Sequence, residues 1–175
     1  PAPNIVAGSK LSNLRQVVQA AMTERGLRCQ CVRCREVRGR GVRAGQLQMQ
    51  DMVYRTRATD EHLISLNTPG DLLAGYLRLS LPRFEIDVGI REIQGAALVR
   101  EVHVYGPAVA IGASDVGQGE TQHRGLGKQL LSKAERIATR AGFAQMAVIA
   151  AVGTREYYSA RGYTQKGTYM LKSLA

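Results

Sequence analysis

The chain has 175 residues, of which 45% are hydrophobic and 22% charged, and its formal net charge is +10. This length and composition fit one globular domain with a hydrophobic core and a small appendage. The longest apolar run falls far short of the roughly 20 residues that a membrane helix needs, so we expect no membrane insertion. The N-terminus lacks the basic and apolar regions of a signal peptide and has no starting Met, which predicts a fragment of a longer chain.

The positive charge is concentrated in the first third of the chain. Residues 1–57 carry eleven Lys and Arg against three acidic residues. Planar guanidinium groups suit phosphate better than a point ammonium does, so a local group of arginines favours a polyanionic partner, nucleic acid first. The alternative is a solvated basic surface. This arginine cluster consists of Arg28, Arg33, Arg35, Arg38, Arg40 and Arg43.

All three cysteines, Cys29, Cys31 and Cys34, lie within six residues. An odd, tightly grouped set argues against the disulfide framework of a secreted protein and predicts a reducing, cytoplasmic compartment. Three thiolates and one histidine make a tetrahedral zinc site, with His62 or His103 as the candidate fourth ligand. We expect such zinc to be structural, because no base near an open position is evident. Three reduced structural thiols are the alternative.

The first half of the chain predicts one helix followed by strands. Apolar spacing from Asn13 to Arg25 predicts a helix that begins after Ser12 and ends at Gly26. Residues 28–45 then form a connector. A turn at residues 68–71 joins two of the expected strands, and residues 80–96 form an irregular excursion. The strands are expected near residues 47–55, 60–67, 72–79 and 97–105.

The second half predicts helices that alternate with buried strands. A loop rich in Gly, Ser and Asp over 106–121 leads into a helix near 125–141. The apolar stretch 145–152 predicts a strand buried on both faces. A short helix over 154–160, capped by Thr154, and one or two strands over 163–171 follow. The fold class is therefore mixed α/β with crossover helices, divided into a helical, cysteine-bearing segment 1–46 and a sheet domain 47–175.

The sequence Gln122-x-x-Gly125-x-Gly127 reads as a glycine turn that opens a helix. Such a turn directs unpaired backbone N–H groups and the positive end of the helix dipole at one point, where a phosphate can bind. The alternative is ordinary turn chemistry. A Walker loop needs Ser or Thr after Gly-Lys, whereas Gln129 follows Lys128 here, and a dinucleotide fingerprint needs a third glycine.

The order of strand, glycine turn with helix, buried strand, Thr-Arg-Glu-Tyr-Tyr helix and Arg-Gly-Tyr strand resembles the GNAT acetyltransferase superfamily. Three segments narrow the resemblance: residues 99–106, 123–127 and 152–158. With Tyr169-Met170, they are similar to the acetyltransferase domain of the Elongator catalytic-subunit family, which modifies the wobble uridine of tRNA. Residues 1–6 and 12–15 resemble the end of that family's radical-SAM barrel, so the likeness spans nearly the whole chain and is weakest at 80–96.

The resemblance implies a GNAT fold with splayed central strands that binds acetyl-CoA. The backbone of four strand residues would hold the pantetheine arm, and Tyr158, with Tyr157 beside it, would lie at the thioester and protonate the thiolate. We expect only one tyrosine to face the ligand, and favour Tyr158. The pantetheine set is Glu101, Val102, His103 and Val104. The pyrophosphate set is Gln122, Arg124, Gly125, Leu126, Gly127, Lys128 and Gln129.

The same resemblance implies that His103 belongs to the coenzyme strand, which makes His62 the preferred zinc ligand. The cysteine spacing does not fit a radical-SAM cluster loop, so S-adenosylmethionine and a 4Fe–4S cluster would belong only to a missing part. The expected function is an acetyl-CoA-dependent step of wobble uridine 34 carboxymethylation. tRNA is the expected partner, with other Elongator subunits only where the source has them. The alternatives are a protein lysine N-acetyltransferase with Glu101 as base, and an RNA-binding module with a vestigial coenzyme site.

Overall fold

The computed structural model describes residues 13–38, 40, 42, 44–105 and 125–174 and divides into two compact units, Pro1–Arg35 and Glu36–Ala175. The first unit contains α1 (Leu14–Glu24), which confirms the predicted helix, and α2 (Val32–Arg35). Asn13 is the residue that precedes α1, and Ser12 lies outside the described residues. The predicted connector over 28–45 contains α2 and the start of a 3-10 turn at Ala44–Gln46.

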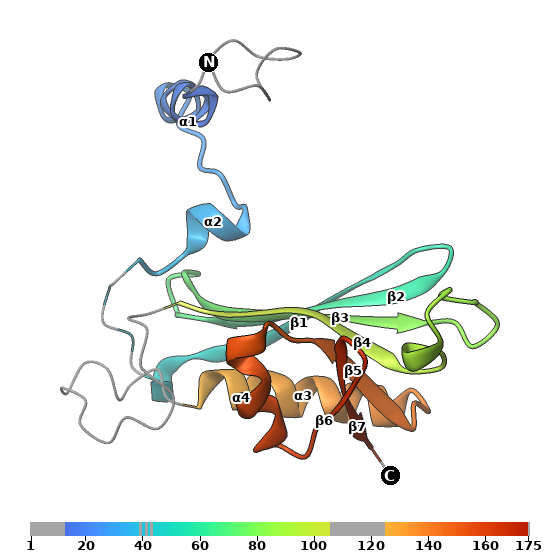
Figure 1. Ribbon diagram of the computed structural model, residues 1–175. Helices are drawn as coiled ribbons and strands as arrows, with labels where there is room; N and C mark the ends of the chain where they lie inside the picture. The colour runs from blue at the N-terminus through green and yellow to red at the C-terminus, as the bar shows by residue number, and fades with distance from the viewer. Residues whose placement is uncertain (1–12, 39, 41, 43, 106–124, 175) are drawn as a thin grey trace. The chain divides into compact units, whose positions relative to one another are not determined.

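The second unit is built on a seven-stranded mixed sheet (Figure 1), in the order β1-β2-β3-β4-β5-β7-β6. Neighbouring strands are antiparallel except for β4 and β5, which are parallel. The predicted mixed α/β class is thus confirmed. The strands are β1 (Gln48–Arg55), β2 (Thr59–Asn67), β3 (Leu73–Pro82), β4 (Ala97–Val104), β5 (Gln145–Ile149), β6 (Thr164–Lys166) and β7 (Tyr169–Ser173).

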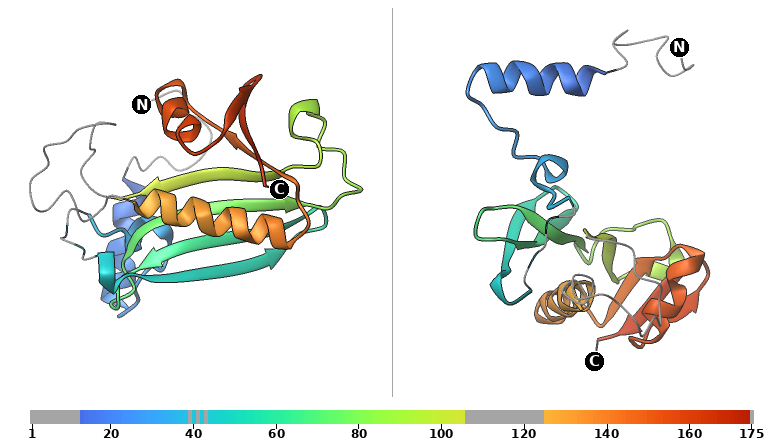
Figure 2. Two further views of the ribbon diagram at one scale, coloured as in Figure 1. Left: turned by 90° about the horizontal axis from the view of Figure 1, so that it is seen from below. Right: turned by 90° about the vertical axis from the view of Figure 1, so that its left-hand side faces the viewer.

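Helix α3 (Leu126–Arg140) lies along one face of the sheet and forms the core there (Figure 2, left). Its apolar side chains recur at helical spacing, so one stripe is buried and the opposite side remains polar. Leu130 and Ala134 of this stripe are fully buried, as are Leu77 of β3 and Val99 of β4. The amphipathic period therefore fixes which side of α3 meets the sheet.

The parallel strands β4 and β5 pair only at one end. The paired residues are Ala97 with Met146, Leu98 with Ala147 and Val99 with Val148. After Val99, β4 continues to Val104 in contact with β3 alone, whereas β5 ends at Ile149 and pairs on its other side with β7. The described strands therefore separate into a gap, as the acetyltransferase resemblance predicts.

The short helix α4 (Arg155–Ser159) follows β5 after a 3-10 turn at Val152–Thr154. The helix was predicted, but its predicted cap was wrong, because Thr154 makes no side-chain capping bond. The Thr154 hydroxyl instead donates backwards to the carbonyl oxygen of Ala151 at 2.9 Å. Strand β5 is also shorter than predicted, because it ends at Ile149. Val152, at the end of the predicted strand, is 75% exposed.

The buried Tyr163 hydroxyl makes stability sensitive to alkaline pH. It donates to Glu135 Oε1 at 2.9 Å, and burial together with the Glu135 charge raises the pKa of Tyr163 above its usual value. Because the pKa is higher in the folded state, the contribution of Tyr163 to the free energy of unfolding is fully present below pH ~10. Above that pH the tyrosine ionises in the unfolded chain, and the free energy of unfolding falls as pH rises further. Urea unfolding from pH 8 to pH 11 should show a shallower loss for Tyr163→Phe. Parallel curves for the two proteins would contradict this.

Candidate functional site: the gap between strands β4 and β5

The N-terminus of α3 has the geometry of an anion site. Gly125 precedes the helix in the left-handed conformation, with φ of 90° and ψ of −10°, which favours glycine. The first intrahelical bond runs from the Gln129 N–H to the Gly125 carbonyl. Backbone N–H groups before Gln129 therefore have no helical acceptor, and they carry the positive end of the helix dipole. Gln122 and Arg124 of the predicted pyrophosphate set lie outside the described residues.

Three segments converge at this helix end. A Cβ added to Gly127 would lie 2.8 Å from Tyr157 Oη of α4 and 3.7 Å from Val104 Cγ2 of β4. The absence of a side chain at Gly127 therefore lets the tyrosine hydroxyl approach the first turn of α3. The structure thus brings together three predicted site residues from the coenzyme strand, the glycine turn and the tyrosine helix.

Arg161 holds the Tyr157 ring in this position. Its guanidinium carbon lies 3.5 Å from the ring centroid, and its Nη1 donates to the Tyr157 carbonyl oxygen. Burial raises the pKa of Tyr157, and the charge and hydrogen bond of Arg161 partly oppose this shift. Sequence reasoning assigned Arg161 no role. The spacing of four residues from Tyr157 was the available signal, because side chains so spaced meet on a helical turn.

Tyr158 occupies a different environment from its neighbour. It is 8% exposed and belongs to the hydrophobic core. Its ring packs edge-on against Tyr157 at 5.2 Å and against Tyr163 at 5.7 Å between centroids. Burial raises the pKa of Tyr158. The Tyr157 hydroxyl therefore reaches the α3 terminus while Tyr158 packs in the core, and the functional role predicted for Tyr158 stays a prediction.

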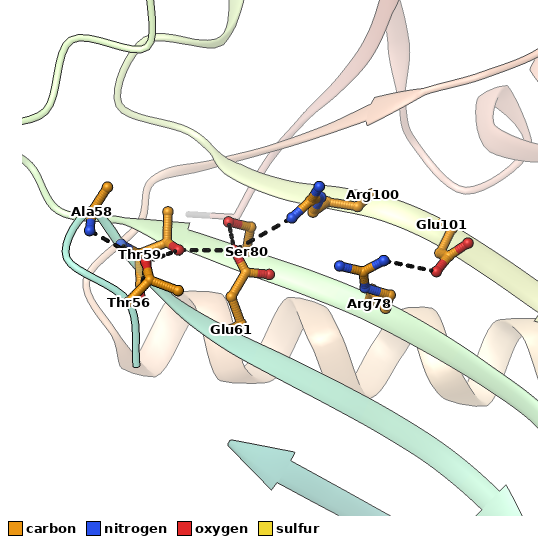
Figure 3. A network of polar contacts seen from close by, with 8 residues as sticks. All are labelled: Thr56, Ala58, Thr59, Glu61, Arg78, Ser80, Arg100 and Glu101. Carbon is orange, nitrogen blue, oxygen red and sulfur yellow. Dashed lines mark hydrogen bonds and ion pairs between the residues drawn. The ribbon is translucent and has the colours of Figure 1, made fainter. Parts of the chain in front are cut away.

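The segment of β4 from Glu101 to Val104 contributes both backbone groups and a carboxylate side chain to the site. Within the stretch from Glu101 to Val104, backbone groups on the side away from β3 border the gap. The Glu101 carboxylate lies 3.2 Å from Arg78 Nη1 and 3.4 Å from His103 Nε2 (Figure 3 shows the Arg78 contact). Glu101 is thus held by two partners, so action as a general base would require release from an ion pair.

The three cysteines form a compact group of free thiols in the first unit. Their sulfur atoms all lie within 4.8 Å of one another, and Cys34 Sγ accepts hydrogen bonds from Arg15 and Gln19. Tetrahedral zinc with Zn–S bonds of about 2.3 Å places its sulfur ligands about 3.8 Å apart, so the group fits the metal after small adjustments. A backbone hydrogen bond from Cys34, then side-chain bonds from Cys29 and Cys34, lowers the pKa of Cys31 to about 6.

His62 lies on β2 in the second unit, and its Nδ1 contacts Asp51 at 3.0 and 3.1 Å. A carboxylate on one ring nitrogen is the usual partner of a histidine that binds metal through the other. The cysteines belong to the first unit and His62 to the second, so the role of His62 as the fourth ligand stays a prediction.

We expect purified chain to contain about one zinc ion per molecule and Cys31→Ser to lose it. A thiol must be deprotonated to bind the metal, so zinc should be retained at neutral pH and released at acidic pH. Elemental analysis after dialysis at pH 7.5 and pH 5 measures both effects. Zinc-free wild-type protein at pH 7.5 would remove the metal site.

The arginine cluster is divided between the two units. Arg28 and Arg33 are exposed in the first unit, and Arg38 and Arg40 are exposed in the second. Arg38 adopts a left-handed backbone with φ of 44°. Arg35 is half-buried, and Arg43 lies outside the described residues. The exposed members are available to solvent in each unit.

Comparison with known proteins agrees with this geometry. A tRNA uridine(34) acetyltransferase from Dehalococcoides mccartyi is 37% identical over 179 residues, covering 99% of this chain and 38% of that protein. Mouse Elongator complex protein 3 is 38% identical over 183 residues, covering 99% and 32%. The solved structure of Methanocaldococcus infernus Elp3 matches with a TM-score of 0.73 and 34% identity, covering 96% and 41%. No protein-family model matches the chain.

The splayed β4 and β5 and the glycine-opened α3 between them define an acetyltransferase fold of the GNAT class. The predicted resemblance is confirmed: over 99% of its length the chain is similar to the tRNA uridine(34) acetyltransferases and to Elongator complex protein 3. It spans about a third of the length of the curated relatives that it matches. Among the described residues, no helix is long and apolar enough to cross a membrane.

Proposed function

We propose that this chain is the acetyl-CoA-binding domain of a tRNA-modifying acyltransferase that acts in wobble uridine 34 carboxymethylation. The observation that carries the proposal is the gap between β4 and β5, where the Tyr157 hydroxyl and Val104 both lie beside Gly127 in the first turn of α3. A gap with free strand backbone on one side and an anion-binding helix end suits a long ligand that carries a pyrophosphate. The relatives named as tRNA uridine(34) acetyltransferases support the reaction class.

Each part of the coenzyme has a candidate partner in this arrangement. The pyrophosphate would accept hydrogen bonds from the backbone of Gly125 to Gln129, with Lys128 adding positive charge. The pantetheine arm would pair with the free edge of Glu101 to Val104. When bound, acetyl-CoA supplies an activated acetyl group as a thioester. A phenol (pKa ~10) can protonate a departing thiolate (pKa ~8.5), and this is the role proposed for the tyrosine pair.

The arginine cluster is proposed to hold the tRNA backbone. Phosphate contacts provide affinity without sequence choice, and each released counterion makes binding weaker at higher salt. We expect tRNA affinity to fall about 10³-fold or more between 50 and 200 mM salt if six or more phosphates are contacted. Arg33→Glu with Arg38→Glu should flatten this dependence in filter-binding assays. Salt-insensitive binding by the unaltered chain would contradict the role of the cluster.

The test of the proposed function is acetyl-CoA hydrolysis with and without tRNA. The chain should cleave acetyl-CoA slowly and faster when tRNA is present, because the proposed acceptor is RNA. Equal rates with and without tRNA, together with transfer to a lysine peptide that Glu101→Gln abolishes, would establish the protein N-acetyltransferase alternative instead. Failure to bind acetyl-CoA would leave the RNA-binding alternative.

A further inference from the structure

Three aromatic rings gather on the sheet face opposite α3. A Cβ added to Gly75 of β3 would lie 3.5 Å from Leu130 of α3, so the next residue, Tyr76, projects to the other face. Tyr76 pairs across the strands with His103, and their rings lie nearly parallel, with centroids 5.1 Å apart and an interplanar angle of 20°. Tyr105 adds a third ring, 6.5 Å from His103 at 22°.

His103 is the exposed member of this ring cluster, which consists of Tyr76, His103 and Tyr105. The His103 side chain is 52% exposed, whereas Tyr76 is 8% exposed and Tyr105 is half-buried. The two tyrosines therefore support the imidazole from the protein side and leave part of it accessible. A second planar ring can stack there, because offset parallel stacking is favourable at such spacings.

Two arginines beside the ring cluster are fixed by acidic partners (Figure 3). Arg78 Nη1 lies 3.2 Å from Glu101 Oε1, and Arg100 Nη1 lies 3.7 Å from Glu61 Oε1. A β-bulge places Arg100 there, since Arg78 pairs with Glu101 while Leu79 pairs with Val99, which leaves Arg100 as the extra residue.

Glu61, the acidic partner of Arg100, is unusual for a carboxylate because it is only 4% exposed. Its Oε1 accepts hydrogen bonds from Ser80 at 2.6 Å and Thr59 at 2.8 Å (Figure 3). Its other oxygen, Oε2, is buried without a hydrogen-bond partner among the described residues. A buried carboxylate of this kind strongly favours a nearby cation, so it holds Arg100 on the sheet face. The Arg100 side chain nevertheless remains 47% exposed.

Half-exposed guanidinium groups next to parallel rings suit an unpaired nucleobase. Bases splayed out of RNA stack on aromatic and guanidinium planes and accept hydrogen bonds on their carbonyl edges. Each guanidinium has five N–H donors, and one acidic partner does not use them all. The net charge of +10 also favours RNA over an acidic or neutral surface.

We propose that the ring cluster, flanked by Arg78 and Arg100, binds an unpaired base of the RNA acceptor. This inference rests on the proposed function and adds where the acceptor lies. His103 belongs to β4, whose backbone borders the coenzyme gap while its side chain reaches the face with the rings. One strand would then hold the acetyl donor by its backbone and the acceptor base by its side chains.

Photocrosslinking with an anticodon stem-loop RNA that carries 5-bromouridine at its wobble position tests the proposal. We expect cross-links to Tyr76, His103 or Tyr105, located by mass spectrometry of the digested adduct. His103→Ala should weaken binding of this RNA about 5- to 150-fold, the loss associated with one stacked base. Arg100→Gln, which leaves the rings in place, should also weaken it. Phe84→Ala is the control, because Phe84 is an exposed aromatic residue outside β3 and β4.

The outcomes separate this proposal from the proposed function. Cross-links confined to residues 28–43, or wild-type RNA affinity in both His103→Ala and Arg100→Gln, would overturn the acceptor site. If the unaltered chain still binds acetyl-CoA in that case, the proposed function stands. Absence of acetyl-CoA binding by calorimetry would instead remove the proposed function. Unchanged acetyl-CoA binding by Arg100→Gln verifies that this variant is folded.

Discussion

Gly127→Ala should weaken acetyl-CoA binding about 5- to 150-fold. The added Cβ would lie 2.8 Å from Tyr157 Oη, a distance that requires either the phenol or the first turn of α3 to move. Forced repacking of this kind costs about 1–3 kcal/mol, which converts to the stated range of affinity. Each of these two groups belongs to the proposed coenzyme site, so movement of either should weaken binding, as measured by isothermal calorimetry.

Gly153→Ala provides the matched control for this substitution. A Cβ at Gly153 meets nothing within 4 Å, and the residue lies in the 3-10 turn before α4. The control should therefore bind acetyl-CoA as the unaltered chain does. Equal affinities for the Gly127 variant and the control would show that the first turn of α3 does not contact the coenzyme.

Tyr157→Phe should lower acetyl-CoA turnover about 10²- to 10⁴-fold, the usual contribution of a general acid. The Tyr157 hydroxyl reaches Gly127 at the end of the gap, and Arg161 holds its ring from the other side. Because the pKa of Tyr157 is raised, the phenol stays protonated through neutral pH, and its ability to donate a proton is lost only at alkaline pH. Rates of thiol release from pH 6 to pH 10 measure this effect.

Tyr158→Phe distinguishes the two tyrosines. Tyr158 lies in the core, so removal of its hydroxyl should change turnover less than tenfold if Tyr157 is the proton donor. The reverse result, a large loss of turnover in Tyr158→Phe and a small one in Tyr157→Phe, would assign the role to Tyr158, as the family resemblance implies.

Arg161→Lys tests the support of the Tyr157 ring. It keeps the charge but not the planar stack, so it should reduce turnover more than coenzyme affinity.

The sequence was sufficient for elements whose own periodicity decides their structure. Leu126, Leu130, Ala134 and Ala138 recur at helical spacing, and all four are buried on one side of α3. The end of β5 was harder to predict from the sequence, because an apolar run does not show where pairing with the partner strand stops. Pairing with β7 stops at Ile149, so the chain turns away before Val152.

The side-chain arrangement of the site depends on strand register, which local pattern does not encode. Tyr76 and His103 are far apart in the chain and meet only because β3 and β4 pair in a particular register. The bulge at Arg100 shifts that register by one residue, and the sequence near Arg100 does not predict this bulge. The glycine turn, in contrast, was predictable because helix opening and left-handed backbone at Gly125 are local properties.

Titration of the chain with acetyl-CoA in a calorimeter is the most direct test of the account. The gap between β4 and β5, with the first turn of α3 and Tyr157 beside it, predicts saturable heat with one molecule of acetyl-CoA per chain. Coenzyme A should compete for the same site, because both carry the pyrophosphate that the first turn of α3 is proposed to bind. A titration without saturable heat, on folded protein, would contradict the central claim that this domain binds acetyl-CoA.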